Sequence, residues 1–378
     1  MTDVIVIGGG LAGTATAYYL ARDGVEVTLL ERFDLNTVAS GSNAGSLHAQ
    51  IPHDPFVNKG DGWAASYVST VGLLARSIDI WRGLGDELGA DLEVKLGGGL
   101  LVARTPADMA AIERKAVFER SQGLEIRILD RDDLAREAPY VDDSMIGGAF
   151  CPDEGKANPF AVAPAFARAA VRHGARIERL TEVRAIVREG EVYAVSTDRG
   201  VFRARRLVNA AGSAAGEIGA MLGANLADVQ AFPIQVSVSE RIGPLIPHLL
   251  YCASDKLTLK QNGVGSVLIG GGWEADIGPN GTPVANVQSL RRNMQVALSV
   301  VPALGDIKIV RSWAALVNGT DDWKPILGEL PGLPGFFVNF FPWMGFTGGP
   351  VAARLVASLV QGHPPPFDLD IAPFLPMG

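Results

Sequence analysis

The sequence is poor in cysteine and has no long apolar segment. Its 378 residues include only Cys151 and Cys252, which lie 101 positions apart. Two cysteines at that separation exclude a disulfide framework and a cysteine-rich metal site, and no metal site is expected. The longest apolar stretch spans residues 335–346 and is interrupted by Asn339 and Pro342. It is shorter than the run of about 18 apolar residues that a membrane-spanning helix needs, so no such helix is predicted.

Basic residues are outnumbered by acidic ones. Lys and Arg total 33 against 41 Asp and Glu, which gives a net charge of −8, and no run of five basic residues occurs. A nucleic-acid partner held through its phosphates is therefore not expected. The opening Met1-Thr2-Asp3 lacks the Lys or Arg of a secretory signal. Together with the scarcity of cysteine, this start predicts a cytoplasmic protein.

The strongest pattern lies in the first 31 residues. The β-branched residues of 3–7 predict a buried parallel strand, which runs into Gly8-Gly9-Gly10-Leu11-Ala12-Gly13, a G-x-G-x-x-G motif. A helix over 14–23 and a second strand over 25–30 follow, and the strand ends at Glu31. This order of strand, glycines, helix, strand and acid predicts a dinucleotide-binding site, since an ordinary glycine-rich turn does not need all five parts.

Each position of the motif has a separate physical reason. Gly8 permits the tight turn, Gly10 lets a pyrophosphate approach the backbone, and Gly13 lets the helix pack on the strand. The phosphates are then expected at the helix N-terminus, where free N–H groups and the helix dipole favour anions. Glu31 is placed to accept hydrogen bonds from a ribose hydroxyl.

A second segment favours FAD over a nicotinamide cofactor. Residues 205–209 predict a strand that runs into the small residues Ala210-Ala211-Gly212. Small residues suit a backbone that passes close to a cofactor, although an ordinary strand-to-helix turn is an alternative. Its position deep in the chain resembles the second cofactor-contacting segment of flavoproteins with a glutathione-reductase-type FAD fold.

Further motifs resemble one flavoenzyme superfamily along nearly the whole chain. Ala39-Ser40-Gly41-Ser42-Asn43-Ala44-Gly45 resembles the Ser-x-x-Asn-Ala-Gly stretch of D-amino acid dehydrogenases and of the glycine oxidase and sarcosine oxidase group. Residues 151–159 resemble its P-x-x-G-x-x-x-P segment before a helix, here expected over 160–173. The paired strands of its substrate domain match 257–261 and 267–271, and its C-terminal motifs match 311–316, 324–328 and 345–350. Within the superfamily, residues 338–347 look most like the FAD-carrying beta subunits of opine oxidases.

The resemblance implies a fold and a division into two domains. The fold class is α/β: a glutathione-reductase-type FAD-binding Rossmann domain interleaved with an α+β, mixed-sheet substrate domain. The FAD-binding domain is expected over residues 1–85, 142–228 and 310–378. The substrate-binding domain is expected over 86–141 and 229–309.

The resemblance also implies a reaction and partners. The expected activity is FAD-dependent oxidation of an opine such as octopine or nopaline, a secondary amine, which yields an amino acid and a 2-oxo acid. A D-amino acid, glycine, sarcosine or proline dehydrogenase or oxidase is the alternative, and a non-catalytic assembly subunit is another. Opine-type relatives imply an alpha subunit, an iron–sulfur small subunit and an FMN at a subunit interface. Because no Cys follows Cys252, non-covalent FAD is expected.

One departure from the family concerns the substrate carboxylate. The single-chain oxidases of the group carry an Arg soon after the Trp-Ala-x-Leu segment, and it holds this carboxylate. Here the segment is followed by Val317-Asn318-Gly319, with no Arg. An Arg is the natural bidentate partner of a carboxylate. Either another cation replaces it, with Lys256, Lys260 and Arg311 as the candidates, or the substrate is held differently.

Side chains expected beside the flavin come from both ends of the chain. His48 follows the Asn-Ala-Gly stretch and could act on the proton of the substrate amine or on the flavin potential, although a structural role is the alternative. Trp343 could cover the flavin face or belong to the core. Residues 345–349 are expected to lead into a helix over 350–361, with Pro350 in its first turn, whose N-terminus stabilises the reduced flavin. The residues expected to contact FAD are Gly8, Gly10, Leu11, Ala12, Gly13, Glu31, Arg32, Ser40, Asn43, Ala44, Gly45, Ser46, Leu47, Val183, Ala210, Ala211, Gly212, Gly345, Phe346, Thr347 and Gly348.

Overall fold

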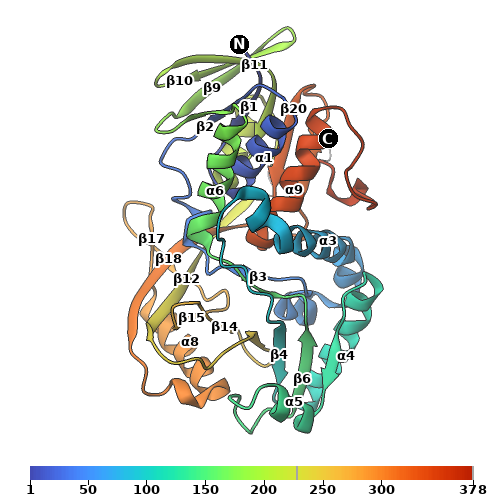
Figure 1. Cartoon of the computed structure of the whole chain (residues 1–378), viewed down its shortest axis with the longest axis vertical. Helices are drawn as coiled ribbons and strands as arrows, with labels where there is room; N and C mark the ends of the chain where they lie inside the picture. Colours follow the sequence, from blue (N-terminus) through green and yellow to red (C-terminus); the bar gives the residue numbers. More distant parts are fainter. Residues whose placement is uncertain (227–228, 377–378) are drawn as a thin grey trace.

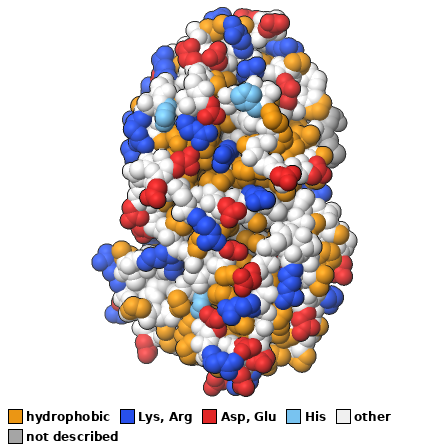
Figure 2. Space-filling model, turned by 45° about the vertical axis from the view of Figure 1, so that its right-hand side comes forward, with side chains coloured by type: hydrophobic (Ala, Val, Ile, Leu, Met, Phe, Trp, Pro, Cys, Tyr) orange, Lys and Arg blue, Asp and Glu red, His pale blue; other side chains and the backbone are white. Residues whose placement is uncertain are grey.

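The computed structural model, which describes residues 1–226 and 229–376, contains two eight-stranded sheets. In Figure 1 the sheet that contains the N-terminal strand lies above the other, and the long helix α3 (His53–Leu88) runs between them. Figure 2 shows acidic and basic side chains interspersed over one face of the molecule. Within the described residues, no helix is long and apolar enough to cross a bilayer.

The first sheet is built around the N-terminal strand β1 (Thr2–Ile7), whose residues 4–7 are almost entirely buried. β1 pairs in parallel with β2 and β11, β2 pairs in parallel with β8, and β11 pairs in parallel with β20. A core of parallel strands buried on both faces accounts for the β-branched sequence of β1. The other strands are β19 (Ile326–Glu329), β20 (Phe336–Phe340), β11 (Gly200–Asn209), β2 (Val27–Leu30) and β8 (Arg176–Glu178). β10 (Val192–Thr197) pairs antiparallel with β11, and β9 (Val183–Glu189) pairs antiparallel with β10.

Helices of the first sheet pack closely around α1 (Leu11–Arg22). α6 (Pro159–Arg172) and α9 (Gly345–Val360) both lie against it, and α3 lies against α9. α1 begins at Leu11, three residues before the predicted start, because the Leu11 amide donates to Ser40 Oγ (2.9 Å) at the end of the glycine turn. Ser40 lies in the short helix α2 (Ala39–Ser42), and α7 (Ala215–Ala220) follows β11.

The second sheet has the strand order β18-β12-β15-β14-β13-β4-β6-β5. The predicted pairing of 257–261 with 267–271 is confirmed, since β14 and β15 run antiparallel with Lys260 opposite Leu268. The strands are β18 (Ile309–Gly319), β12 (Gln230–Arg241), β15 (Ser266–Gly270), β14 (Thr258–Gln261), β13 (Leu249–Cys252), β4 (Gly99–Ala103), β6 (Gly147–Cys151) and β5 (Arg127–Leu129). The helices that accompany this sheet are α4 (Pro106–Ser121), α5 (Arg131–Glu137) and α8 (Val287–Val300).

Two strands lie in the second sheet, although the sequence analysis assigned their residues to the FAD-binding domain. β6 and β18 belong to the second sheet, whereas the segments 142–228 and 310–378 assign them to the FAD-binding domain. We therefore propose that the domain boundaries lie after Cys151 and after Gly319. The predicted boundary at residue 228 and the end of the last segment at 378 lie outside the described residues.

A small two-stranded sheet joins segments that are far apart in the sequence. β3 (Ser46–Leu47) pairs antiparallel with β7 (Gly155–Lys156), and Ser46 lies opposite Lys156. A second small sheet pairs β16 (Asp276–Ile277) with β17 (Pro283–Val284). The β3–β7 pair lies between the two large sheets in Figure 1, and it brings the residues after β3 beside those before β7.

We predict that Gly13→Ala destabilises the protein. A Cβ at Gly13 would lie 1.9 Å from the carbonyl oxygen of Gly8, so α1 would have to move off the strand, at a cost of about 1–3 kcal/mol in the free energy of unfolding. Gly83→Ala is the matched control, because it lies in α3 where a Cβ meets no atom within 4 Å. It should stabilise by about 0.5–1 kcal/mol. Urea unfolding of both variants checks this, and equal midpoints would contradict it.

Candidate active site

A cavity of about 440 Å³ opens where four strands of the first sheet end. Its lining includes Gly8 after β1, Glu31 after β2, Ala210 after β11 and Phe341 after β20. Ligands of α/β sheets bind at this carboxyl edge, outside the strand ends. Fourteen of the residues expected to contact FAD line this cavity: Gly8, Gly10, Leu11, Ala12, Glu31, Arg32, Ser40, Asn43, Val183, Ala210, Ala211, Gly212, Gly345 and Phe346.

The glycine turn forms the floor of this first cavity. Gly8 has a positive φ of 115°, and a Cβ there would lie 2.4 Å from the carbonyl oxygen of Ala210. A Cβ at Gly10 would lie 2.9 Å from Ser40 Oγ. The amides of Ala12 and Gly13, which follow Leu11, lie in the first turn of α1 and have no acceptor within the helix. The turn therefore presents backbone N–H groups to the cavity, as an anion-binding site requires.

Glu31 lines the cavity and also braces the turn. Its Oε2 accepts a hydrogen bond from the Gly9 amide (2.6 Å), and its Oε1 accepts one from the Phe33 amide (2.7 Å). The carboxylate is thus held at the end of β2, at the position where the motif places a ribose.

Several buried polar atoms in the first cavity have no protein partner. Among the described residues, Asn36 Oδ1, Asn318 Oδ1, Asn339 Oδ1 and Trp343 Nε1 are buried without a hydrogen bond, and all four residues line the cavity. Buried polar groups are normally paired, so these atoms fit a bound polar molecule. Sequence reasoning missed the three asparagines. A signal existed for Asn339, which is a polar residue inside the longest apolar stretch.

A second cavity of about 760 Å³ adjoins the first and extends against the second sheet. Its wall includes residues of β12, β14 and β18. The five residues common to both linings are Ala39, Asn43, Val317, Trp343 and Phe346. Because the linings meet there, a ligand in the first cavity can contact a ligand in the second.

The N-terminal turn of α9 lies at this junction. The expectation that the helix begins near Pro350 is wrong, because α9 begins at Gly345 and Pro350 is an interior residue. The Gly348 amide already donates to the Met344 carbonyl oxygen (2.9 Å), which closes the first turn around 345–347. The free amides of that turn, and the positive end of the helix dipole, therefore lie beside Phe346, where the cavities meet.

Thr347 anchors that turn through buried hydrogen bonds. Its Oγ1 accepts from the His48 amide (2.8 Å), and its carbonyl oxygen accepts from Ser77 Oγ (2.5 Å) and Trp81 Nε1 (2.9 Å) of α3. Gly348 lines neither cavity, and a Cβ there would lie 2.2 Å from the ring of Phe341. Its role in the structure is close packing.

The remaining predicted contacts divide between the second cavity and the interior. Ala44, Ser46 and Thr347 line the second cavity. Gly13, Gly45, Leu47 and Gly348 line neither cavity.

His48 lines the second cavity and is hydrogen-bonded through one ring nitrogen. Its Nδ1 lies 2.6 Å from the Tyr251 hydroxyl. Burial, and to a lesser extent the positive charge of Lys260, lower the pKa of His48 to about 3. The imidazole is therefore neutral at physiological pH. His53 also lines this cavity, and burial lowers its pKa to about 4.

Lys260 is a buried cation in the same cavity. Only 1% of the residue is exposed, and its Nζ donates to Ser46 Oγ (2.5 Å). Burial, followed by the charge of Lys156, lowers the pKa of Lys260 to about 7. Lys256 lines the cavity in a half-buried position. Arg311, the third predicted candidate for the carboxylate, is exposed and lines neither cavity, so the structure does not support that role.

Trp343 lines both cavities and is part of an aromatic stack. Its indole lies against Trp323 (centroids 4.5 Å apart) and against Phe232 (4.9 Å). Its backbone is left-handed, with φ at 52°, and its amide donates to the Asn318 carbonyl oxygen (2.7 Å). A bulky residue at positive φ needs such support. The stack holds the Trp343 side chain in the lining of both cavities.

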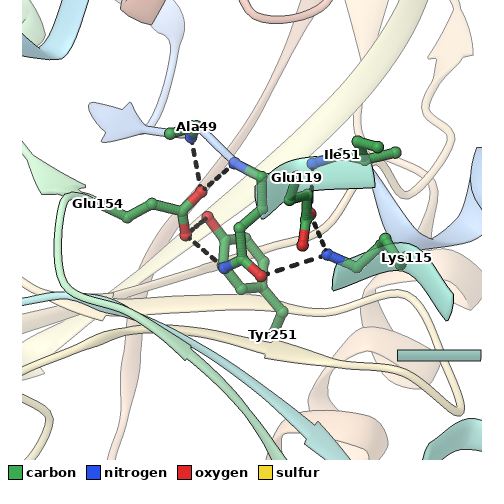
Figure 3. Close-up of polar contacts among 7 residues, drawn as sticks. Ala49, Ile51, Lys115, Glu119, Glu154 and Tyr251 are labelled. Atoms are coloured by element: carbon green, nitrogen blue, oxygen red, sulfur yellow. Dashed lines mark hydrogen bonds and ion pairs between the residues drawn. The ribbon is translucent and has the colours of Figure 1, made fainter. Parts of the chain in front are cut away.

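A buried polar network, which sequence reasoning did not predict, forms one end of the second cavity (Figure 3). Glu154 is fully buried, and its carboxylate accepts from the amides of Ala49 (2.6 Å) and Gln50 (2.8 Å) and from the Tyr251 hydroxyl (3.1 Å). Nearby, Lys115 forms a buried ion pair with Glu119. Glu154 directly precedes β7, so the pairing of β7 with β3 brings its carboxylate beside 49–50.

Comparisons with known proteins agree with this architecture. The family model described as FAD dependent oxidoreductase matches residues 3–359. The beta subunit of sarcosine oxidase from Arthrobacter sp is 27% identical over 368 residues, which cover 95% of this chain and 86% of that protein. An opine oxidase subunit from Rhizobium meliloti is 25% identical, over 89% of this chain and 87% of that protein. The crystal structure of glycine oxidase from Geobacillus kaustophilus has a TM-score of 0.84 at 25% identity, and the match covers 100% of this chain and 98% of that one.

These findings confirm the predicted fold class and the prediction of FAD as a cofactor. The first sheet and its helices form an FAD-binding Rossmann fold, and the enzyme is an FAD-dependent oxidoreductase that acts on the carbon–nitrogen bond of amines or amino acids. The match leaves out only the first two residues and those after 359. The chain belongs to the FAD dependent oxidoreductase family.

Proposed function

We propose that this enzyme oxidises a secondary amine whose nitrogen carries two carboxylate-bearing groups, as in opines such as octopine and nopaline. Bound FAD supplies the acceptor for the hydride that leaves the carbon next to nitrogen. Water then hydrolyses the imine to an amino acid and a 2-oxo acid. The observation that carries the proposal is the lysine lining of the second cavity.

Lys260 is the strongest candidate to bind a substrate carboxylate. A buried cation is costly unless an anion pairs with it, yet among the described residues the Lys260 Nζ hydrogen-bonds to the Ser46 hydroxyl and to no carboxylate. An incoming carboxylate would complete this pair. The half-buried Lys256 also lines the cavity and could bind a second carboxylate, whereas Lys115 is already paired with Glu119.

The size of the second cavity suits a conjugated substrate. Its volume of about 760 Å³ lies within the range of roughly 300–1,000 Å³ that is usual for sites of drug-sized ligands. A conjugate of an amino acid and an oxo acid is larger than glycine or sarcosine, and it would use more of this space. The aromatic wall at Trp343 and Trp323 offers a surface for a guanidinium or alkyl group.

Non-covalent FAD would be held by the lining of the first cavity. The amides of the glycine turn would bind the pyrophosphate, and Glu31 would bind a ribose. The first turn of α9 would stabilise negative charge on the reduced ring system. Cys252 is buried in the second cavity, and burial raises the pKa of its thiol, which disfavours the thiolate that a covalent link to flavin needs.

We further propose that the chain functions in the cytoplasm as the catalytic subunit of a hetero-oligomer. Two of its relatives, from sarcosine oxidase and from opine oxidase, are named as subunits of those enzymes. A corresponding alpha subunit and an iron–sulfur small subunit would complete the enzyme, with an FMN at a subunit interface. Cys151 and Cys252 are too few for a cluster, so another chain would have to hold it.

Oxidation of a smaller amine is the second candidate function. Glycine oxidase and the beta subunit of sarcosine oxidase have identities to this chain as high as that of the opine oxidase subunit. D-Amino acids and proline belong to the same class of substrate. Lys260 alone could hold the single carboxylate of any of these molecules.

The first prediction concerns the substrate. In an anaerobic titration of the FAD-loaded enzyme, alone and with its partner subunits, octopine or nopaline should bleach the oxidised-flavin absorption band. Glycine, sarcosine, D-alanine and proline should bleach it far more slowly, because they fill less of the cavity. Bleaching by one of these small amines alone would establish the second candidate function. A flavin that stays oxidised with every amine would overturn the catalytic assignment.

The second prediction concerns pH and Lys260. Because burial holds the pKa of this lysine near 7, the side chain is cationic below pH 7 and neutral above it. The affinity for oxydiacetate, a dicarboxylate that cannot be oxidised as an amine, should therefore fall about tenfold per pH unit above pH 7. Flavin-absorbance titrations measure this affinity.

Substitution variants isolate the contribution of Lys260. Lys260→Met should weaken oxydiacetate binding at pH 6 by about 100-fold and remove the pH dependence, since it removes a buried charge partner. Lys308→Met, at an exposed position outside both cavities, is the matched control and should change neither. An unchanged pH profile in Lys260→Met would refute the role of Lys260.

The third prediction concerns Glu31. Glu31→Ala should weaken FAD binding by about 10- to 100-fold, because it removes charged hydrogen bonds worth about 1.5–3 kcal/mol from the cofactor site. Fluorescence titration of the apoprotein with FAD measures this. Glu113→Ala removes an exposed acid of α4 and should leave the affinity unchanged. Equal affinities of the two variants would show that Glu31 does not contribute.

A further inference from the structure

We propose that His48, Tyr251 and Glu154 form a relay that accepts the proton of the bound substrate ammonium. The inference rests on the proposed amine oxidation. An ammonium nitrogen has no lone pair to form the imine, so the proton must leave before the hydride does. The relay would let the enzyme bind the protonated amine, which is the abundant form at neutral pH, and deprotonate it in place.

Continuous hydrogen bonds link the three side chains. His48 Nδ1 lies 2.6 Å from Tyr251 Oη, which lies 3.1 Å from Glu154 Oε2. All three residues line the second cavity. Gly99 of β4 makes room for the carboxylate, since a Cβ there would lie 1.7 Å from Glu154 Oε2. Figure 3 shows the Glu154 carboxylate facing Tyr251 on one side and the 49–50 backbone on the other.

The donors around Glu154 determine the direction of these bonds. Its Oε1 accepts from the amides of Ala49 and Gln50, and its Oε2 accepts from Gln50 Nε2 (2.9 Å). In the resting state that the relay requires, Glu154 is ionised and can only accept, so the single hydroxyl proton of Tyr251 points to Glu154. Tyr251 Oη must then accept from His48 Nδ1–H. The neutral imidazole consequently carries its lone pair on Nε2, the ring atom left for the cavity.

The transfer balances in three moves. The substrate ammonium gives a proton to His48 Nε2, and His48 Nδ1 gives its proton to Tyr251 Oη. Tyr251 Oη gives its own proton to Glu154 Oε2. The products are a neutral amine, a neutral imidazole in the other tautomer, an unchanged phenol and a carboxylic acid. No electrons are transferred, so the relay needs no oxidant.

Burial favours Glu154 as the final acceptor. It lowers the pKa of His48 to about 3, so an imidazolium is unfavourable, and raises the pKa of Tyr251 well above its ordinary value, so a tyrosinate is unfavourable. It also raises the pKa of Glu154, which favours the protonated carboxyl. When the three transfers are concerted, the proton reaches the acid without formation of an imidazolium or a tyrosinate.

The other ionisable groups around the relay come from several elements. Lys115 and Glu119 of α4 form an ion pair, and the Lys115 Nζ donates to Gln50 Oε1 (3.2 Å). Cys151 of β6 lies near Tyr251 and Glu154, and Lys260 of β14 lies near His48. Of these, Lys260 titrates nearest neutrality, so the relay is best tested in a comparison of variants that all retain Lys260.

The first experiment detects the tautomer and needs no substrate. Nitrogen NMR of the FAD-loaded enzyme, labelled with ¹⁵N-histidine, should show His48 neutral at pH 7 with the proton on Nδ1. In Glu154→Gln, the introduced side-chain amide would donate to Tyr251 Oη. The Tyr251 hydroxyl would then donate to His48 Nδ1, and the imidazole proton of His48 should move to Nε2. The relay would be overturned if His48 of the wild-type enzyme carried its proton on Nε2 or were an imidazolium. It would also be overturned if His48 had the same tautomer in the wild-type enzyme and in Glu154→Gln.

The second experiment detects proton transfer. In anaerobic stopped-flow reduction by the best amine, Tyr251→Phe should lower the rate constant divided by the substrate Kd by about 100-fold at pH 7. The loss in this ratio should shrink about tenfold for each pH unit above pH 7. It should vanish above the pKa of the amine, because the substrate is then deprotonated before it binds. A merely structural defect would give a loss independent of pH, and that result would refute the relay.

A matched control exists elsewhere in the chain. The Tyr140 hydroxyl lies 2.8 Å from His248 Nδ1, and Glu137 lies on the other side of that ring, outside both cavities. Tyr140→Phe should leave the pH profile of flavin reduction unchanged. If no amine reduces the wild-type flavin, the proposed function fails, and the tautomer measurement still decides whether the hydrogen-bonded relay exists.

Discussion

The arrangement of the site depends on how the N-terminal turn of α9 is held between the two sheets. Thr347 ties this turn to the His48 amide on one side and to Ser77 and Trp81 of α3 on the other. The bonds are buried, so breaking any one would leave an unsatisfied polar group. The same turn places Phe346 at the junction of the cavities. The two cavities therefore share one structural element, the first turn of α9.

Buried charge distinguishes the second cavity from the first. The first cavity presents backbone amides, unpaired amide oxygens and the Glu31 carboxylate, as a large polar cofactor requires. The second contains Lys260, Glu154 and the paired Lys115, all of which lost their hydration on folding. Such groups are costly for stability, and they cluster where function needs shifted proton affinities. In the reaction that we propose, the lysine would bind an anionic substrate and the acid would accept the departing proton.

Several features of the site could be predicted because they depend on local geometry. Gly8 and Glu31 directly follow parallel strands, which bring their carboxyl ends to one edge, and Gly10 directly precedes α1. The α9 start could not be predicted from Pro350, because the buried bonds of Thr347 and the left-handed Trp343 determine it. The sheet membership of β6 and β18 depends on pairing partners far away in the sequence. Glu154 could not be recognised either, since an acid in a Pro-Asp-Glu-Gly turn resembles an ordinary exposed loop.

The sequence by itself determined the FAD-binding half, the family and the class of reaction. Glycine spacing, strand patterns and motif order are local properties, and the cofactor that they recognise is the same throughout the family. Only the tertiary structure decided which cations line the second cavity and which acid is linked to His48 through Tyr251. Lys260 is in the second cavity and Arg311 is exposed, although both lie on strands of the same sheet. Burial and hydrogen bonding between distant segments control charge and proton position, and both arise only when the chain has folded.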